Sequence, residues 1–218
     1  MKLDKRSYIE KISEVLAFLK LTDAATASEK LYEYLFILFQ QNQVMNLVSV
    51  NTMDELIQTH LYDSLIPVQY FPELINKAHC LKAIDIGSGG GFPAIPMSIV
   101  SQNSQWIMVE SIQKKANFLK KAVNALKLCG TIVIPFRVEE FIKTCPIPPL
   151  HLVTIRAVGK IEVIYPYIQV FRKRHIPVVL WKHPDELDKF NESQKDPLPY
   201  EDHPYPVNNG SKHILLIR

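Results

Sequence analysis

Four of the seven glycines in the chain lie within residues 87–91, directly after a short apolar run. Glycine has no Cβ, so such a cluster lets the backbone turn tightly and approach another group closely. In a domain of alternating strands and helices, the turn after the first strand is a place where ligands bind. The cluster therefore predicts a binding loop for a nucleotide-like ligand, with an ordinary glycine turn as the alternative.

Two kinds of ligand compete for this loop. A dinucleotide-binding loop needs a third glycine three positions after the second, and that position here is Phe92. The segment from Asp85 to Gly91 instead fits D-x-G-x-G-x-G, a pattern typical of S-adenosylmethionine binding. Glu110 ends the next predicted strand, where a carboxylate can accept hydrogen bonds from ribose hydroxyls. The sequence therefore predicts an S-adenosylmethionine site that includes Asp85, Gly87, Gly89, Gly91 and Glu110.

Hydrophobic periodicity predicts the elements that hold this loop. Helical spacing runs through residues 7–20, 28–41 and 52–67, and Thr52 and Glu55 open the last of these as a capping box. Helices are also predicted at residues 113–128 and 163–171. Apolar runs predict strands at residues 81–86, 106–109, 131–135, 152–155 and 176–181. This alternation predicts an α/β fold with a mostly parallel, doubly wound central sheet.

The same pattern predicts the plan of the rest of the chain. Residues 183–206 hold five of the fifteen prolines and predict a long loop with room for one turn of helix. Residues 213–217 predict a closing edge strand. Residues 1–75 form a helical extension and residues 76–218 the core with the sheet, and we expect both to make one compact unit.

Charge is unevenly distributed along the chain. The net charge of +3 divides into 7 Lys/Arg against 10 Asp/Glu in residues 1–80, 14 against 5 in residues 81–182, and 4 against 7 in residues 183–218. The middle segment therefore carries about +9 and would attract a polyanion through phosphate contacts. The alternative is that its lysines simply solvate helix faces.

Several classes of protein are disfavoured by the sequence. No apolar run approaches the roughly 20 residues of a membrane span, and the charged N-terminus is not followed by the apolar stretch of a signal peptide. Cys80, Cys129 and Cys145 form no CxxC pair, and their odd number suits a reducing cytosol. The histidines do not have the spacing of metal ligands. We expect a cytoplasmic monomer that binds neither membrane nor metal.

Four segments together resemble one bacterial family, the 16S ribosomal RNA guanine-N7 methyltransferases, also called glucose-inhibited division protein B or small-subunit rRNA methyltransferase G. The resemblance runs from about Tyr32 to Trp181, with the order and spacing of the motifs kept. The segments are Asn46-Leu47 with His60-Leu61-Tyr62-Asp63-Ser64-Leu65, the loop from Asp85 through Phe92 to Pro96, Val109-Glu110-Ser111 with Lys114-Lys115, and Arg137-Val138-Glu139-Glu140 with Arg156-Ala157-Val158. The motifs G-F-P-x-I-P and H-x-x-D-S-L together are much more specific than a glycine loop alone.

The resemblance implies a Rossmann-like class I methyltransferase. Its reaction would move a methyl group from S-adenosylmethionine to N7 of a guanine in the 530 loop of 16S ribosomal RNA, either naked or in a small-subunit particle. Guanine N7 carries a lone pair and no proton, so no catalytic general base is required. The resemblance also implies cofactor contacts by Gly87, Phe92, Val138, Glu139 and Arg156. Arg156 is the candidate for positioning, with a salt bridge inside the fold as its alternative role.

Further residues are candidates for contact with RNA or for shaping the pocket. The basic candidates for RNA binding are Lys114, Lys115, Arg137, Arg172, Lys173, Arg174 and Lys182. The structural or substrate-facing candidates are Asn46, His60, Asp63 and Ser64, of which His60 and Asp63 share one helix face. The sequence departs from the family at Thr59, Ala94, Met97 and His183, where the family usually has Arg, Gly, Leu and Gly. Thr59 and His183 bear on the RNA end of the pocket.

Two other functions fit parts of this pattern. One is methylation of a small molecule or a protein, which the charge of the middle segment disfavours. The other is a non-catalytic, RNA-binding assembly factor that kept the fold. Affinity for S-adenosylmethionine separates the enzymes from the assembly factor.

Overall fold

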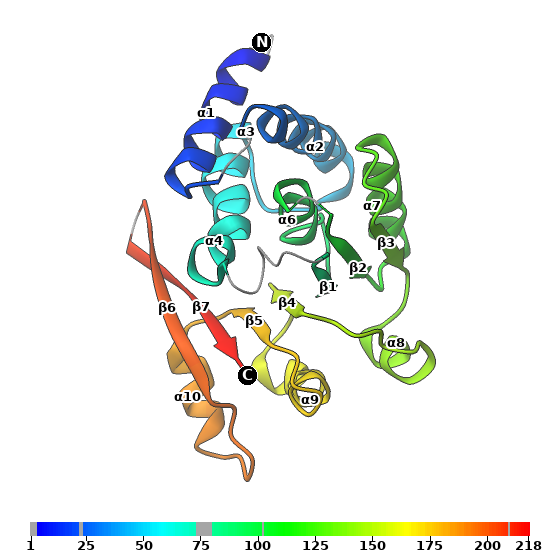
Figure 1. The fold of residues 1–218 in the computed structure, drawn as a ribbon, viewed down its shortest axis with the longest axis vertical. Coiled ribbons are helices and arrows are strands. Elements are labelled where there is room, and N and C mark those ends of the chain that lie inside the picture. The colour runs from blue at the N-terminus through cyan, green and yellow to red at the C-terminus, as the bar shows by residue number, and fades with distance from the viewer. Residues whose placement is uncertain (1–3, 22–23, 73–79, 102, 209) are drawn as a thin grey trace.

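In the computed structural model, which describes residues 4–21, 24–72, 80–101, 103–208 and 210–218, a seven-stranded sheet organises the chain (Figure 1). Its strands are β1 (Lys82–Ile86), β2 (Gln105–Val109), β3 (Thr131–Ile134), β4 (Leu152–Arg156), β5 (Val178–Trp181), β6 (Tyr200–Val207) and β7 (Gly210–Ile217). Their order is β3-β2-β1-β4-β5-β7-β6. Strands β1 to β5 run parallel, and β7 is antiparallel to both of its neighbours. The predicted α/β fold with a mostly parallel, doubly wound sheet is confirmed.

The strand order reverses at β1. This strand pairs with β2 on one side and with β4 on the other, so that Ile84 lies opposite both Ile107 and Val153. In open α/β sheets, ligands bind at the carboxyl ends of the strands beside such a reversal. Because β7 is antiparallel, its first residues lie at this same edge of the sheet.

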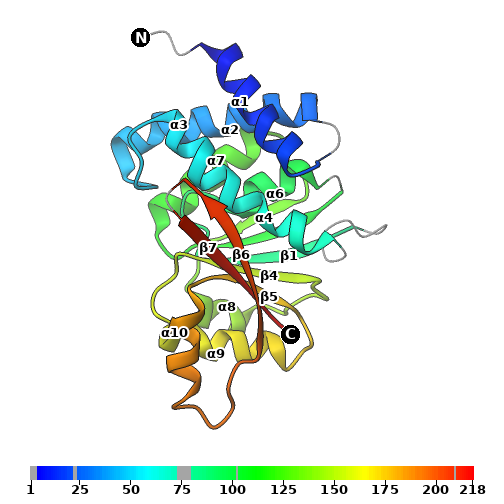
Figure 2. The same ribbon diagram turned by 90° about the vertical axis from the view of Figure 1, so that its left-hand side faces the viewer.

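Helices cover both faces of the sheet (Figure 1, and from the side in Figure 2). One face carries α1 (Lys5–Phe18), α2 (Ala24–Met45), α3 (Met53–Glu55), the π-helix η1 (Leu56–Leu61), α4 (Tyr62–Tyr70), α6 (Ala94–Val100) and α7 (Gln113–Ala125). The other carries α8 (Val138–Thr144), α9 (Ile161–Arg172) and α10 (Pro184–Asn191). None of these described helices is long and apolar enough to cross a membrane.

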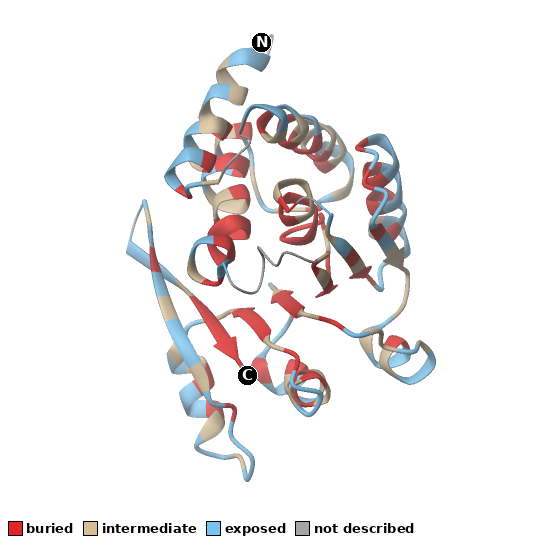
Figure 3. Cartoon of the chain, viewed as in Figure 1, coloured by how far each residue is buried: buried red, intermediate tan, exposed pale blue. Residues whose placement is uncertain are grey.

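The alternation of side chains along the strands separates two hydrophobic cores among the described residues. Val179 of β5 belongs to the core with the N-terminal helices, whereas Val178 and Leu180 belong to the core with α9. Figure 3 shows buried residues concentrated on the strands and on the inward sides of the helices. The N-terminal helices share their core with the sheet, and the predicted boundary between residues 75 and 76 lies outside the described residues.

The helical segment of residues 53–70 is longer than predicted. Its predicted capping signal is confirmed, because the Glu55 amide donates to Thr52 Oγ1 at 3.1 Å. The segment contains a π-helical turn and continues through Pro67. Proline has no N–H to offer the carbonyl of Asp63 four residues earlier. The indole N–H of Trp181 donates to that carbonyl instead, at 3.1 Å, so a side chain from β5 replaces the missing backbone hydrogen bond.

Two predictions for the C-terminal segment are wrong. Residues 183–206 are not a long loop, because they contain α10 and most of β6. Residues 213–217 lie in β7, between β5 and β6, so β6 is the edge strand. Pro204 and Pro206 suggested a loop because proline cannot donate a ladder hydrogen bond. Because the two prolines are two residues apart, their backbone nitrogens point to the same side of β6, toward the open edge of the sheet. At this edge the Pro204 carbonyl accepts from the Tyr70 hydroxyl at 2.8 Å.

Other differences concern the ends of elements. The second helix is longer than residues 28–41, α7 ends three residues before residue 128, and α8 was not predicted. Such shifts are common because helix ends are weakly specified by sequence.

Candidate functional site

The glycine loop turns directly after β1. The amides of Gly87 and Ser88 donate to the Val109 carbonyl at 2.8 and 3.2 Å, which ties the start of the loop to the end of β2. Gly87 has a φ of +72°, and a Cβ there would lie 2.5 Å from Val158 Cγ2. Both the backbone conformation and the space therefore require glycine at this position.

Tyr34 of α2 supports the loop from within the protein. Its hydroxyl donates to the Gly90 carbonyl at 2.9 Å, and its ring meets Phe92 edge to face with 5.4 Å between centroids. A Cβ on Gly91 would lie 3.1 Å from the same hydroxyl. The Tyr34 side chain is fully buried, and this burial raises its pKa well above the ordinary value, so the hydroxyl remains a donor. The N-terminal helices thus hold the loop in its shape.

Asp85 lies beneath the loop and does not line the cavity. Its carboxylate accepts from Thr154 Oγ1 at 2.7 Å through Oδ1, and Oδ2 has no hydrogen-bond partner among the described atoms. Burial raises the pKa of Asp85 to about 7. Gly91 is also absent from the cavity lining. The structure therefore places both residues where they support the loop, and their predicted contact with a cofactor stays a prediction.

Glu110 follows β2 and points its carboxylate at the loop. Oε2 accepts from the Gly89 amide at 2.8 Å and Oε1 from the Ile112 amide at 2.7 Å. The residue is almost completely buried but lines the cavity. Each carboxylate oxygen has two acceptor positions, so both oxygens can accept a further hydrogen bond from a ligand.

A cavity of about 500 Å³ lies in front of this loop. The predicted site residues Gly87, Gly89, Phe92, Glu110 and Arg156 line it, together with Lys115 and His60. The segment after α2 forms another wall with Leu47 and Val48, whose amides both donate to Asn42 Oδ1. The predicted Asn46 is exposed at the left-handed turn (φ +46°) that ends α2, and it does not line the cavity.

A smaller hollow of about 160 Å³ adjoins this cavity and shares Gly87 and Val158 with it. Val138 and Glu139, both predicted to contact the cofactor, line this hollow. Tyr167 of α9 donates to the Glu139 carboxylate, and this hydrogen bond lowers the pKa of Glu139. Burial, followed by the same hydrogen bond, raises the pKa of Tyr167 to about 12. Most of the residues that line the hollow are apolar, which suits an aromatic ring system.

Arg156, at the end of β4, joins the cavity to the N-terminal helices. Its Nη1 donates to the His60 carbonyl at 3.1 Å and to Ser64 Oγ at 2.9 Å, and its Nη2 donates to Asp63 Oδ2 at 3.0 Å. The guanidinium also lies 5.7 Å from the centre of the Phe92 ring, within the range of a cation–π contact. The salt bridge considered for Arg156 is present, and the same residue lines the cavity.

The π-helical turn η1 presents His60 to the cavity. The imidazole packs on Phe92 with 5.1 Å between centroids. Burial, with smaller contributions from Arg156 and Lys212, lowers the pKa of His60 from 6.5 to about 4. His60 is therefore neutral at physiological pH. Thr59, one residue earlier, donates to the Glu55 carbonyl within its own helix.

The basic candidates for RNA binding divide between the two edges of the sheet. Lys114, Lys115 and Arg137 follow the carboxyl ends of β2 and β3, at the edge with the cavity. Lys182 lies there too but bonds to the Gly159 carbonyl and Glu186. The cluster of Arg172, Lys173 and Arg174 precedes β5, at the opposite edge, and Arg172 pairs with Asp196 at 3.0 Å.

Several residues at the site were not predicted from sequence. Tyr34, Val48, Trp181, Tyr205 and Lys212 come from distant segments and belong to no local motif. The Asn46-Leu47 motif is the local signal next to the Leu47–Val48 wall, and Asn46 itself forms the left-handed turn that leads into that wall.

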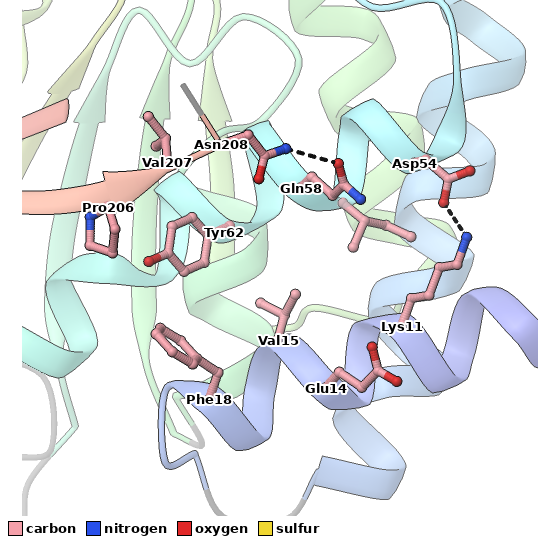
Figure 4. Close-up of a pocket in the computed structure, with 11 residues that line it drawn as sticks. Lys11, Glu14, Val15, Phe18, Asp54, Gln58, Tyr62, Pro206, Val207 and Asn208 are labelled. Carbon is pink, nitrogen blue, oxygen red and sulfur yellow. Dashed lines mark hydrogen bonds and ion pairs between the residues drawn. The ribbon is translucent and has the colours of Figure 1, made fainter. Parts of the chain in front are cut away.

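Another hollow, of about 640 Å³, lies between α1, the helical segment of residues 53–70 and the end of β6 (Figure 4). Lys11 pairs with Asp54 there, and Asn208 donates to Gln58 at 3.3 Å. None of the predicted site residues lines it. Among the described residues no group of three or more His, Cys, Asp or Glu side chains could hold a metal ion.

Solved structures and curated relatives are similar to this chain. A putative O-methyltransferase from Klebsiella pneumoniae aligns with a TM-score of 0.60 at 10% identity, covering 98% of this chain and 97% of that one. The cofactor-bound protein Rv0187 from MTB aligns with a TM-score of 0.61 at 15% identity, covering 94% and 95%. At these identities the likeness shows the fold alone, which is the Rossmann-like fold of class I methyltransferases.

Sequence comparison goes further. Ribosomal RNA small subunit methyltransferase G of Sorangium cellulosum is 35% identical over 157 residues, which are 72% of this chain and 64% of that protein. The matched stretches span 43% to 64% of the length of the first three curated relatives. The model of the GidB family, described as rRNA small subunit methyltransferase G, matches residues 27–213. This match covers most of the chain, so the chain belongs to the GidB family.

Proposed function

We propose that this chain transfers a methyl group from S-adenosylmethionine to N7 of a guanine in the 530 loop of 16S ribosomal RNA. The observation that carries the proposal is a single cavity in which the glycine loop, the Glu110 carboxylate and the Arg156 guanidinium meet. Membership of the GidB family supports the RNA substrate, and the charge of about +9 in residues 81–182 favours a polyanion. The partner would be the RNA itself or the small-subunit particle, met in the cytoplasm by a monomer.

The residues of the cavity fit this cofactor. The two oxygens of Glu110 retain acceptor positions for the two hydroxyls of a ribose. Gly87 and Gly89 line the cavity, and the amino-acid tail would lie beside them. The hollow lined by Val138 and Tyr167 would take the adenine. These residues would hold the cofactor along the carboxyl ends of β1, β2 and β4.

When bound, S-adenosylmethionine supplies a methyl group on a positively charged sulfur. The N7 lone pair of guanine forms the new C–N bond as the C–S bond breaks, the electron pair of that bond stays on sulfur, and the positive charge passes to the base. No proton is removed, so the protein acts by holding the two groups in line. His60 is neutral and Arg156 is paired with Asp63, and both features limit repulsion of a sulfonium in this cavity.

Two measurements test the proposal. Calorimetry should show that the chain binds S-adenosylmethionine. Glu110→Gln should weaken this affinity about tenfold through the loss of charge-assisted hydrogen bonds. Gly87→Asp should abolish the binding. Glu140→Gln is the matched control, because Glu140 is exposed on α8 and lines neither the cavity nor the smaller hollow. A wild-type chain without affinity for S-adenosylmethionine would overturn the enzyme assignment.

The substrate is tested in cells. Mass mapping of 16S ribosomal RNA with and without this gene should show one guanine-N7 methyl group that depends on it. An unchanged methylation pattern would overturn the substrate and leave the fold and the cofactor site standing.

A further inference from the structure

A second cavity, of about 350 Å³, adjoins the first and shares Arg156 and Ala157 with it. It lies at the carboxyl ends of β4 and β5 and beside the first residues of β7, with Trp181, Tyr205 and Lys212 in its walls. Its volume is within the range of about 300 to 1,000 Å³ that is typical of small-molecule sites. Because Arg156 forms a wall of both cavities, a group in the second cavity would lie next to one in the first.

Two buried polar atoms of this cavity, one on Asp63 and one on Tyr205, lack a hydrogen bond of normal geometry. Asp63 is 2% exposed, and its Oδ2 accepts from Arg156 at 3.0 Å and from Lys212 at 2.7 Å. Within the part of the chain that the structure describes, Asp63 Oδ1 and the Tyr205 hydroxyl make no hydrogen bond of normal geometry. The Asp63 carboxylate is nevertheless a neighbour of this hydroxyl, because burial and then Asp63 raise the pKa of Tyr205. Tyr205 is 1% exposed. Buried polar atoms are normally paired, so an unpaired carboxylate oxygen and hydroxyl in one cavity point to a ligand that supplies both partners.

The walls of the cavity have the chemistry of a nucleotide site. The indole of Trp181 and the rings of His183 and His213, which lie 4.8 Å apart between centroids, offer aromatic surface on which a base can stack. Lys182 and Lys212 also line this cavity. Enzymes that modify a base take it out of the helical stack into a pocket of this kind.

We propose that this second cavity receives the base of the target nucleotide, and that the Asp63 carboxylate and the Tyr205 hydroxyl recognise its hydrogen-bonding edge. The inference rests on the proposed function, which makes that base a guanine. Guanine offers two adjacent donors, N1–H and the 2-amino group, which suit a carboxylate, and beside them the acceptor O6, which suits a hydroxyl donor. These groups form the Watson–Crick edge of guanine, to which N7 does not belong, so this mode of binding leaves N7 free for methylation.

Lys212 is the part of the cavity that moves in this proposal. Its side chain is 45% exposed, whereas Arg156, the other partner of Asp63, is only 11% exposed. The base donors replace the Lys212 ammonium on Asp63, and Arg156 keeps its ion pair. The released ammonium can then contact the phosphate of the same nucleotide.

Tyr205→Phe tests the proposal without disturbing the fold. The lost hydroxyl makes no hydrogen bond of normal geometry among the described atoms, so the melting temperature should change little. The affinity for S-adenosylmethionine should also be unchanged, while kcat/KM for unmethylated small-subunit particles should fall about tenfold, the loss of one hydrogen bond. Tyr200→Phe on the same strand is the control, because Tyr200 does not line the cavity and donates to Asp188 instead. Equal kcat/KM for Tyr205→Phe and wild type would overturn the proposal.

A second measurement does not depend on catalysis. Saturation-transfer NMR should show that the wild type binds guanosine monophosphate at least several-fold tighter than inosine monophosphate, which lacks only the 2-amino group. Asp63→Asn should lose this preference, provided that its circular dichroism shows a folded chain. Equal binding of both nucleotides by the wild type would overturn base recognition by Asp63, even if the enzyme methylates RNA. Failure of the wild type to methylate particles would instead overturn the proposed function alone.

Discussion

The guanidinium of Arg156 donates to the Asp63 carboxylate at 3.0 Å, and this ion pair joins the end of β4 to helix α4. Both side chains are nearly buried, so solvent screens the pair little. Arg156 also lines both cavities. One contact therefore fixes the wall between the first cavity and the second cavity, and it depends on the N-terminal helices being in place.

Arg156→Lys should damage both stability and activity. Lysine keeps the charge but cannot donate at once to the His60 carbonyl, Ser64 and Asp63 as the planar guanidinium does. We expect a loss of about 2–3 kcal/mol in the free energy of unfolding, from two or more lost hydrogen bonds, and at least a tenfold loss of methyl transfer. Arg172→Lys is the matched control, because its ion pair with Asp196 is more exposed than the Arg156–Asp63 pair and should contribute less than about 1 kcal/mol. Similar losses in both variants, measured by urea unfolding, would contradict this prediction.

Tyr34→Phe should weaken cofactor binding from a distance. The substitution leaves the Gly90 carbonyl without its buried donor, at a cost of about 1–3 kcal/mol, and loosens the loop that the carbonyl belongs to. Calorimetry should show a Kd for S-adenosylmethionine raised about tenfold. Tyr32→Phe on the same helix is the control, since the Tyr32 ring is buried against Phe36 and away from the loop. A Kd equal to that of the wild type would show that Tyr34 has no part in holding the loop.

The sequence predicts the centre of this site because its signals there are local. The glycine loop and Glu110 each follow directly on an apolar run, and parallel strands bring the ends of such runs to one edge. Strands β1 to β5 and the sheet type were predicted for the same reason, because their apolar runs are also local signals. Arg156 could be placed at the end of β4, and its two candidate roles are both compatible with the structure, which shows the salt bridge.

The rest of the site depends on contacts between segments far apart in the chain. Nothing near Tyr34 in sequence indicates that its hydroxyl reaches Gly90, 56 residues away. Lys212 contacts Asp63 only because β7 is inserted between β5 and β6. The prolines of β6 led to the prediction of a loop in place of that strand. The continuation of α4 through Pro67 likewise depends on Trp181, which supplies a donor from another strand.

Asp85 and His60 should give opposite pH dependence of stability. Burial raises the pKa of Asp85 from 3.8 to about 7, so between these values the folded chain holds a proton that the unfolded chain has lost, and stability falls as pH rises. The pKa of His60 is lowered from 6.5 to about 4, so between these values the unfolded chain binds the extra proton, and stability rises with pH. In the wild type the two effects partly cancel.

The single variants separate these effects. In Asp85→Asn, the free energy of unfolding should rise more steeply between pH 4 and pH 7 than in the wild type, because only the His60 effect remains. In His60→Gln it should rise less steeply or fall. Urea unfolding at several pH values measures the slopes, and parallel profiles for the three proteins would contradict the assignment.

The position of the lysines around the sheet predicts which of them contact RNA. Lys114 is exposed at the start of α7, beside the cofactor cavity, whereas Lys173 is exposed at the end of α9, at the opposite edge of the sheet. Lys114→Ala should weaken binding to small-subunit particles and reduce the slope of log K against log salt by about one, the contribution of one phosphate contact. Lys173→Ala removes the same charge and should leave affinity and slope unchanged. If both variants lose affinity equally, RNA binding depends on the net charge of the chain and not on the position of each lysine. The carboxyl edge of the sheet is then not the RNA-binding face.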